Sequence, residues 1–100
     1  MKNFRTYDLA VTFYRLIRLL QVTGHLRDQL NRAAQSIVLN LAEGNGRASK
    51  KDQRRFFTIA LGSLRECQAA LQLEKLENTE ADKVLDRLGA HLYKLIQNTR

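Results

Sequence analysis

The 100-residue sequence contains no proline, no tryptophan, one cysteine and only five glycines. A β-rich chain of this length would need more turn-forming residues, so the scarcity of proline and glycine favours an all-α fold. The single cysteine, Cys67, excludes an internal disulfide framework and a metal site built from several cysteines. Because Cys67 falls in the middle of an apolar helical arc, we expect a buried thiol and not a nucleophile.

Long hydrophobic runs are also absent. The apolar residues of positions 1–20 are interrupted by Asp8, Arg15 and Arg18, and no small-residue cleavage site follows them. This pattern fits neither a signal peptide nor a membrane span. We therefore expect a cytoplasmic protein without a membrane partner.

Residue patterns for catalysis, and for binding a metal or a cofactor, are missing as well. The two histidines, His25 and His91, have no suitably spaced carboxylates or cysteines, and the sequence has no Glu-x-x-His motif. The glycines of the segment 44–50 lack the spacing of a nucleotide-binding phosphate loop. We expect no enzymatic activity, no metal and no cofactor.

The composition that is present fits one soluble globular domain over residues 1–100, with 44% hydrophobic and 27% charged residues. Lysine and arginine exceed the acidic residues, which gives a formal net charge of +7. Such an excess suggests a polyanionic partner, most often nucleic acid and less often an anionic membrane. Many small basic proteins nevertheless bind no nucleic acid specifically, so the charge alone leaves the partner open.

Apolar residues that recur every three to four positions predict four helices, over about 7–21, 25–43, 50–76 and 80–97. Ser49 and Thr79 are each followed three residues later by an aspartate, which makes them N-cap candidates for the third and fourth helices. Gly44 and Gly46 are expected to end the second helix in a positive-φ conformation. Short connections between the helices favour an antiparallel up-down-up-down four-helix bundle.

The predicted third helix carries more apolar residues than one core face needs. Its apolar positions spread over about 200°, whereas those of the fourth helix cover about 120°. Gly62 and Ser63 are small residues in its middle, where glycine costs about 1 kcal/mol relative to alanine. We expect another element to pack closely against this position.

In an up-down-up-down bundle, the turn between the second and third helices lies at the same end as both termini. This end collects nine cations: Lys2, Arg5, Arg47, Lys50, Lys51, Arg54, Arg55, Lys94 and Arg100. Asp8, Glu43 and Asp52 oppose them. The N-terminus of the third helix adds free backbone N–H groups, which bind anions. We predict a nucleic-acid-binding site formed by Arg47, Ser49, Lys50, Lys51, Arg54 and Arg55.

Contacts of this kind favour phosphates over bases. Phe56 and Phe57 follow the cluster, but their spacing places both rings in the core, so we expect little base stacking. The predicted ligand is duplex or structured RNA, or a nucleic-acid backbone in general. A charge run is usually only a solvated face, and this alternative stays open.

A polar stripe runs along the second helix, formed by Arg32, Ser36, Asn40 and Glu43. Glu43 lies in the last turn of the helix, where a carboxylate opposes the helix dipole. We expect it to pair with Arg47, Arg54 or Arg55, in the same subunit or in another one. The stripe as a whole is either an interface or a solvated polar face.

Residues 32–66 also carry a long motif. It consists of Arg32, Ser36-Ile37, Asn40-Leu41-Ala42-Glu43-Gly44, Gly46-Arg47, Ala60, Gly62-Ser63-Leu64 and Glu66. With this motif the chain resembles the four-helix-bundle family of proteins encoded in intervening sequences of bacterial large-subunit ribosomal RNA genes. The accessory variability protein of diversity-generating retroelements is related to this family. One departure is Val38-Leu39, where many members have Pro-Ser, and it should leave the second helix straighter.

The resemblance implies a bundle that assembles into a ring-shaped homo-oligomer, typically a pentamer. It adds Gly62, Ser63 and Glu66 to the polar stripe as candidates for an oligomer interface or a structural polar stripe. For the retroelement relative it implies binding to a reverse transcriptase and to nucleic acid, whereas most members have no established biochemical activity. We favour a basic homo-oligomeric nucleic-acid-binding protein. The alternatives are an adaptor for an acidic partner such as a reverse transcriptase, and a purely structural assembly module.

Overall fold

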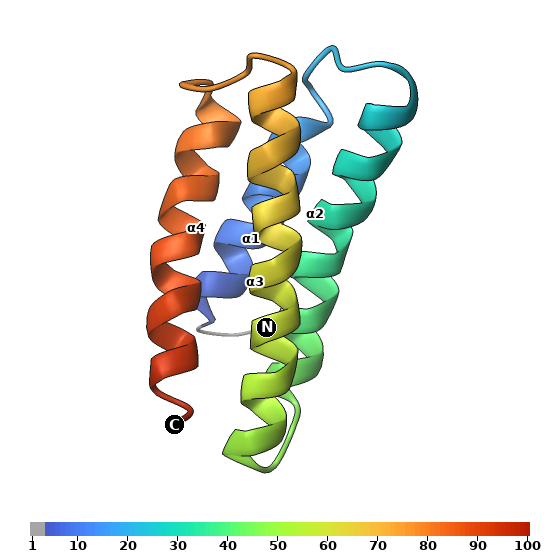
Figure 1. Cartoon of the computed structure of the whole chain (residues 1–100). Helices are drawn as coiled ribbons and strands as arrows, with labels where there is room; N and C mark the ends of the chain where they lie inside the picture. Colours follow the sequence, from blue (N-terminus) through green and yellow to red (C-terminus); the bar gives the residue numbers. More distant parts are fainter. Residues whose placement is uncertain (1–3) are drawn as a thin grey trace.

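The computed structural model describes residues 4–100 and contains four helices, α1 (Arg5–Ile17), α2 (Gly24–Asn45), α3 (Lys50–Leu73) and α4 (Glu80–Gln97). Consecutive helices run antiparallel (Figure 1), and α1 also packs on α4, which closes the bundle. The body measures 39 × 21 × 20 Å. The all-α four-helix bundle expected from the sequence is confirmed. Within residues 4–100, no helix is both long and apolar enough to cross a membrane.

The core lies along the bundle axis and receives one apolar face from each helix. Phe13 of α1, Leu41 of α2, Leu64 of α3 and Leu88 of α4 are almost completely buried. Cys67 is buried among these side chains, as predicted, and burial raises the pKa of its thiol to about 12. The thiol is therefore protonated at neutral pH and is a poor nucleophile.

The two predicted N-caps are confirmed. The backbone N–H of Asp52 donates to Ser49 Oγ at 3.1 Å, and that of Asp82 donates to Thr79 Oγ1 at 3.2 Å. The Asp82 carboxylate also accepts a hydrogen bond, at 2.9 Å, from the backbone N–H of Asn78, the residue before Thr79. Each cap satisfies one of the N–H groups that a helix leaves unpaired at its start.

Two helices end earlier than predicted. α3 stops at Leu73 because Lys75 adopts a left-handed conformation with φ of 55°. The N–H groups of Leu76 and Lys75 then bond back to the carbonyls of Leu71 and Gln72, at 2.8 and 3.0 Å. This is a Schellman ending, which glycine usually supplies. α1 stops at Ile17, and the apolar residues 19–20 that prolonged the prediction belong to the connection.

The expectation that Gly44 and Gly46 adopt positive φ was wrong. Gly46 has a φ of −86°, and Gly24, at the start of α2, is the glycine with positive φ among residues 4–100. Gly44 instead lies inside α2, where a Cβ atom would come within 2.5 Å of the Phe57 ring. Its small size lets α2 and α3 approach closely at this end of the bundle.

Candidate nucleic-acid interface

The connection between α2 and α3 projects from one end of the bundle. α2 and α3 contain 22 and 24 residues, whereas α1 contains 13. The ring of Phe4, just before α1, lies 6.4 Å from the ring of Phe57, which is two turns into α3. The end of α2 and the first turns of α3 therefore extend past the start of α1 (Figure 1). We call residues 43–56 the basic tip.

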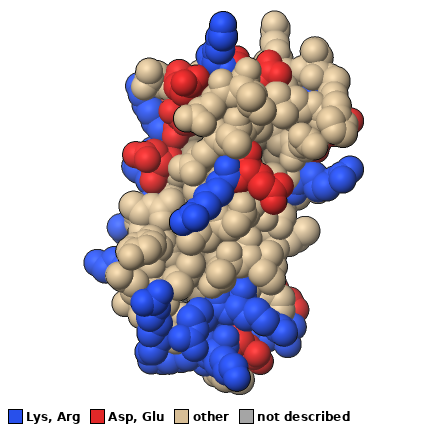
Figure 2. All heavy atoms as spheres, in the orientation of Figure 1, with Lys and Arg blue, Asp and Glu red and all other residues tan. Residues whose placement is uncertain are grey.

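The structure brings the predicted nucleic-acid-binding residues together on the basic tip. Arg47, Lys50, Lys51 and Arg55 are exposed and Arg54 is half-buried. Figure 2 shows lysine and arginine side chains gathered at this end, whereas both signs of charge mix over the rest of the visible face. Five cations face two carboxylates there, Glu43 and Asp52, which leaves a formal charge of +3.

The terminal segments contribute less to this end than predicted. The C-terminal end of α4 lies at the same end of the bundle as the tip (Figure 1), so Lys94 and Arg100 are on that side. Arg5 begins α1, which starts short of the tip. Lys2 lies outside the described residues. The positive charge is therefore concentrated on one hairpin.

The turn inside the tip is held by its own hydrogen bonds. Ser49 caps α3 and its carbonyl accepts the N–H of Gln53 at 3.0 Å. The Gln53 side chain donates back to the carbonyl of Arg47 at 3.2 Å. The Ser49 hydroxyl oxygen therefore serves as the N-cap of α3. The backbone N–H groups in the first turn of α3 have no acceptor within the helix, so they are the groups that could face an anion.

Glu43 has the arginine partner that its position requires. Its Oε1 atom accepts from Arg47 Nη2 at 2.7 Å, one helical turn further along the same chain. Of the three predicted partners, Arg47 is therefore the correct one. Both side chains remain substantially exposed, at 54% and 40%, so the pair contributes about 0–1 kcal/mol to stability. The pair places the Arg47 guanidinium beside Glu43, on the side of the tip formed by the end of α2.

Phe56 is not a core residue, which corrects the prediction. Phe57 is 2% exposed, but Phe56 is only half-buried. The guanidinium carbons of Arg47 and Arg55 lie over the Phe56 ring, 4.7 and 4.8 Å from its centroid. Consecutive residues are buried together elsewhere in the bundle, as at Ala70-Leu71 and Val84-Leu85, so the spacing of the two phenylalanines did not reveal in advance that Phe56 lies outside the core.

The polar stripe divides into parts with different roles. Asn40 Nδ2 donates to the carbonyl and the hydroxyl of Ser36, at 2.8 and 3.1 Å. Ser63 of α3 donates to the same Ser36 hydroxyl at 2.8 Å. The middle of the stripe is therefore a hydrogen-bonded junction between α2 and α3, while Glu43 belongs to the basic tip.

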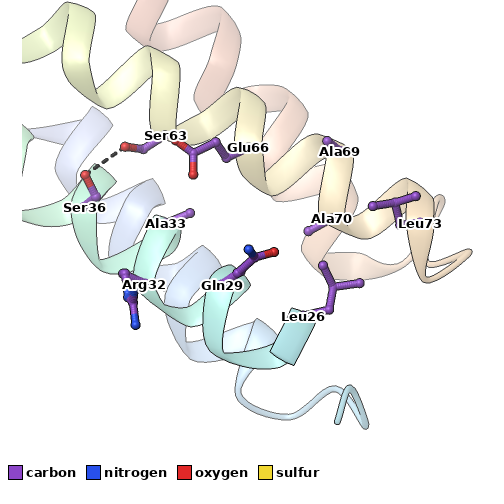
Figure 3. Close-up of a pocket in the computed structure, with 10 residues that line it drawn as sticks. All are labelled: Leu26, Gln29, Arg32, Ala33, Ser36, Ser63, Glu66, Ala69, Ala70 and Leu73. Carbon is purple, nitrogen blue, oxygen red and sulfur yellow. Dashed lines mark hydrogen bonds between the residues drawn. The ribbon is translucent and has the colours of Figure 1, made fainter. Parts of the chain in front are cut away.

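A groove of about 490 Å³ lies next to this junction, between α2 and α3 (Figure 3). Gln29 and Arg32 of α2 line it opposite Ser63 and Glu66 of α3. In Figure 3, Gln29 reaches between the two helices and Arg32 points away from α3. Gly62 is exposed, and a Cβ atom added there would meet nothing within 4 Å. The close neighbour expected at Gly62 is therefore not supplied by residues 4–100.

Comparison with known proteins agrees with this architecture. A family model described as 23S rRNA-intervening sequence protein matches residues 4–98. The chain belongs to this family. The match spans all four helices and includes the whole motif of residues 32–66, so the resemblance based on that motif is confirmed. A comparison with curated proteins gives no match.

The part of the chain that the structure describes offers no candidate metal site. No three His, Cys, Asp or Glu side chains of residues 4–100 lie close enough together to hold a metal ion. In this member of the 23S rRNA-intervening sequence protein family, the exposed cluster of cations on the basic tip is the main chemical feature of the described surface.

Proposed function

We propose that this 23S rRNA-intervening sequence family protein is a non-enzymatic, homo-oligomeric protein that binds the phosphate backbone of nucleic acid, RNA in particular, through its basic tip. The observation that carries the proposal is the projection of five cations on one hairpin, beyond the start of α1. The family's description adds an RNA-related setting.

The energetics of such a site follow from counterion release. Each phosphate neutralised on duplex nucleic acid lowers the slope of log affinity against log salt by about 0.9. Four or five contacts per protomer predict that affinity falls by about 10²-fold or more between about 50 and 200 mM salt. Contacts of this type carry little sequence information, so different duplexes and hairpins should bind with similar affinity.

The test is fluorescence anisotropy with a structured RNA hairpin and a DNA duplex, at low and moderate salt. A tip variant carries glutamine at Arg47, Lys50, Lys51, Arg54 and Arg55. A matched control loses the same charge away from the tip, with glutamine at Arg15, Arg27, Arg65, Lys83 and Arg87. We expect the tip variant alone to lose binding and salt dependence. An equal loss of affinity in both variants would show that binding depends on net charge and not on the tip. If the wild type binds neither nucleic acid, the adaptor alternative, in which the tip binds an acidic protein, replaces the proposal.

We place the self-association surface at the Arg32 end of the polar stripe, away from the basic tip. Ser36, Asn40 and Ser63 have partners within the chain, so Arg32, Gly62 and Glu66 are the residues available to a second copy. Leu73 lies beside the same groove and is 73% exposed. The complex mass, measured by light scattering on wild type and an Arg32→Ala/Glu66→Ala variant, tests this. An oligomer that persists unchanged in the variant contradicts the assignment of this interface.

A further inference from the structure

Two arginines of the basic tip share one aromatic ring. The guanidinium carbons of Arg47 and Arg55 lie 4.7 and 4.8 Å from the centroid of the Phe56 ring. These distances limit the separation of the two carbons to at most 9.5 Å, the 4.7 Å of one plus the 4.8 Å of the other. Arg47 and Arg55 come from opposite sides of the turn, and both are exposed. We call these three residues the Arg47–Phe56–Arg55 cluster.

A guanidinium group that rests on a ring is held in place without losing its donors. Its N–H groups lie in the guanidinium plane and do not bond to the ring face, and their fork geometry matches a phosphate. Arg47 uses Nη2 to donate to Glu43 at 2.7 Å, and the other donors of its fork are not engaged by that pair. Glu43 and Phe56 thus hold the Arg47 guanidinium from two directions.

The other cations of the tip have no comparable support. Among residues 4–100, Lys50, Lys51 and Arg54 take part in no ring contact or ion pair. A long side chain that is ordered only when the ligand arrives loses conformational entropy at that moment, which weakens binding. The supported arginines should therefore lose less entropy on binding than the unsupported cations.

From this geometry we propose that the Arg47–Phe56–Arg55 cluster is a preorganised fork for two neighbouring phosphates of one nucleic-acid strand, with Phe56 as its positioning residue. The proposal rests on the proposed function of the basic tip and specifies its ligand chemistry. A phosphate fits better than a stacked base because both arginines already lie over the Phe56 ring, which is itself half-buried.

The first test preserves charge and changes shape. The double variant Arg47→Lys/Arg55→Lys keeps both positive charges but removes the planar forks from the ring. Arg54→Lys is the matched control, since Arg54 lies on the same helix outside the cluster. Two probes are used, a structured RNA hairpin and inorganic polyphosphate, which has phosphates and no bases. We expect the double variant to bind both probes about tenfold more weakly, with Arg54→Lys within about twofold of wild type.

The second test addresses Phe56 directly. Phe56→Leu keeps an apolar side chain and the net charge, and Phe56→Trp restores an aromatic face. We expect Phe56→Leu to lose about tenfold in affinity for both probes with its salt dependence retained, and Phe56→Trp to recover most of that loss. A thermal melt of each variant separates loss of folding from loss of positioning, and the lysine variants leave Phe56 intact.

Several results would overturn the assignment. Wild-type affinity in the double lysine variant would exclude a preorganised fork. A loss in Phe56→Leu that tryptophan does not restore would assign Phe56 to packing alone. Weakened binding to the RNA hairpin with unchanged binding to polyphosphate would identify a base-stacking site. Wild-type binding by the five-glutamine tip variant would contradict the proposed function itself. Wild-type binding by the cluster variants alone would contradict only the preorganised fork.

Discussion

Three helical glycines of this chain have very different surroundings, and replacing each with alanine tests the packing argument. Gly44 lies in α2, Gly62 in α3 and Gly89 in α4. Since alanine is better than glycine in a helix by about 1 kcal/mol, the substitution alone should stabilise all three. If the measured change in unfolding free energy differs from this value, the difference reflects the contacts of the added methyl group.

The structure predicts opposite signs for Gly44 and Gly62. At Gly62 nothing lies within 4 Å of the added Cβ, and at Gly89 the nearest atoms, from Leu64, lie at an ordinary 3.7 Å. Gly62→Ala and Gly89→Ala should therefore each raise the free energy of unfolding by about 1 kcal/mol. At Gly44 the Cβ would lie 2.5 Å from the ring of Phe57, which is 2% exposed and cannot swing into solvent.

Overpacking costs about 1–3 kcal/mol, and because the clash at Gly44 is with a rigid buried ring we take the upper part of this range, about 2–3 kcal/mol. The helix-propensity gain offsets part of this cost, so we expect Gly44→Ala to lower the free energy of unfolding by about 1–2 kcal/mol. In a domain of this size, 1 kcal/mol corresponds to about 4–8 °C in Tm. The Gly44 and Gly62 variants, about 2–3 kcal/mol apart, should therefore differ by roughly 8–24 °C in Tm.

The assay is urea unfolding followed by far-UV circular dichroism, repeated over a range of protein concentrations because association raises apparent stability. A Gly44→Ala variant as stable as wild type would refute the close approach of α2 and α3. A Gly62→Ala variant that is less stable than wild type, and loses oligomer mass, would show that another copy packs on Gly62. In that case the stabilisation expected from alanine at Gly62 would be seen only at protein concentrations where the variant is monomeric.

Further predictions concern the caps, the thiol and the tip carboxylate. Ser49→Ala and Thr79→Ala should each lower the free energy of unfolding by about 1 kcal/mol, measured by urea titration, because each removes an N-cap acceptor; unchanged values would argue against these caps. The folded-state pKa of Cys67, about 12, exceeds the unfolded value of 9.0, so its contribution to stability is complete below pH 9 and is lost as the pH rises towards 12. Unfolding free energies of wild type and Cys67→Ala across this range check the loss, and parallel curves would contradict it. Glu43→Gln should bind the RNA hairpin about two- to threefold more tightly at low salt, because the tip gains one net charge while the glutamine side-chain oxygen can still accept a hydrogen bond from Arg47; anisotropy measures this, and weaker binding would show that the negative charge of Glu43 is needed to hold Arg47.

The fold was largely predictable because its signals are local. The spacing of apolar residues gave four helices, and Ser49 and Thr79 marked two helix starts correctly. The end of α3 was missed because its left-handed residue is Lys75, where sequence patterns lead one to expect glycine. Gly44 was misinterpreted because a helix-ending glycine and a close-packing glycine look the same in a sequence.

The candidate site was predictable to the extent that its residues are close in the sequence. The cations of the tip lie within nine positions, so any compact turn brings them together. The hydrogen bond between Ser36 and Ser63 joins residues 27 positions apart, and it depends on the register of α2 against α3. The contact of Arg47 with Phe56 depends on the path of the turn between them. No periodicity contains either piece of information.

The close packing of the α2–α3 hairpin explains how the bundle tolerates this concentration of like charge. Five cations on one turn repel one another, and repulsion favours an open turn. Several interactions oppose that opening: the Ser49 cap, the Gln53 bond to the Arg47 carbonyl and the Glu43–Arg47 pair. Beneath them Gly44 lies against Phe57, which anchors the tip to the core. The same contacts that offset the repulsion hold the backbone of the turn and the Arg47 side chain in place, so the stability of the hairpin and the proposed binding of phosphates depend on the same few residues.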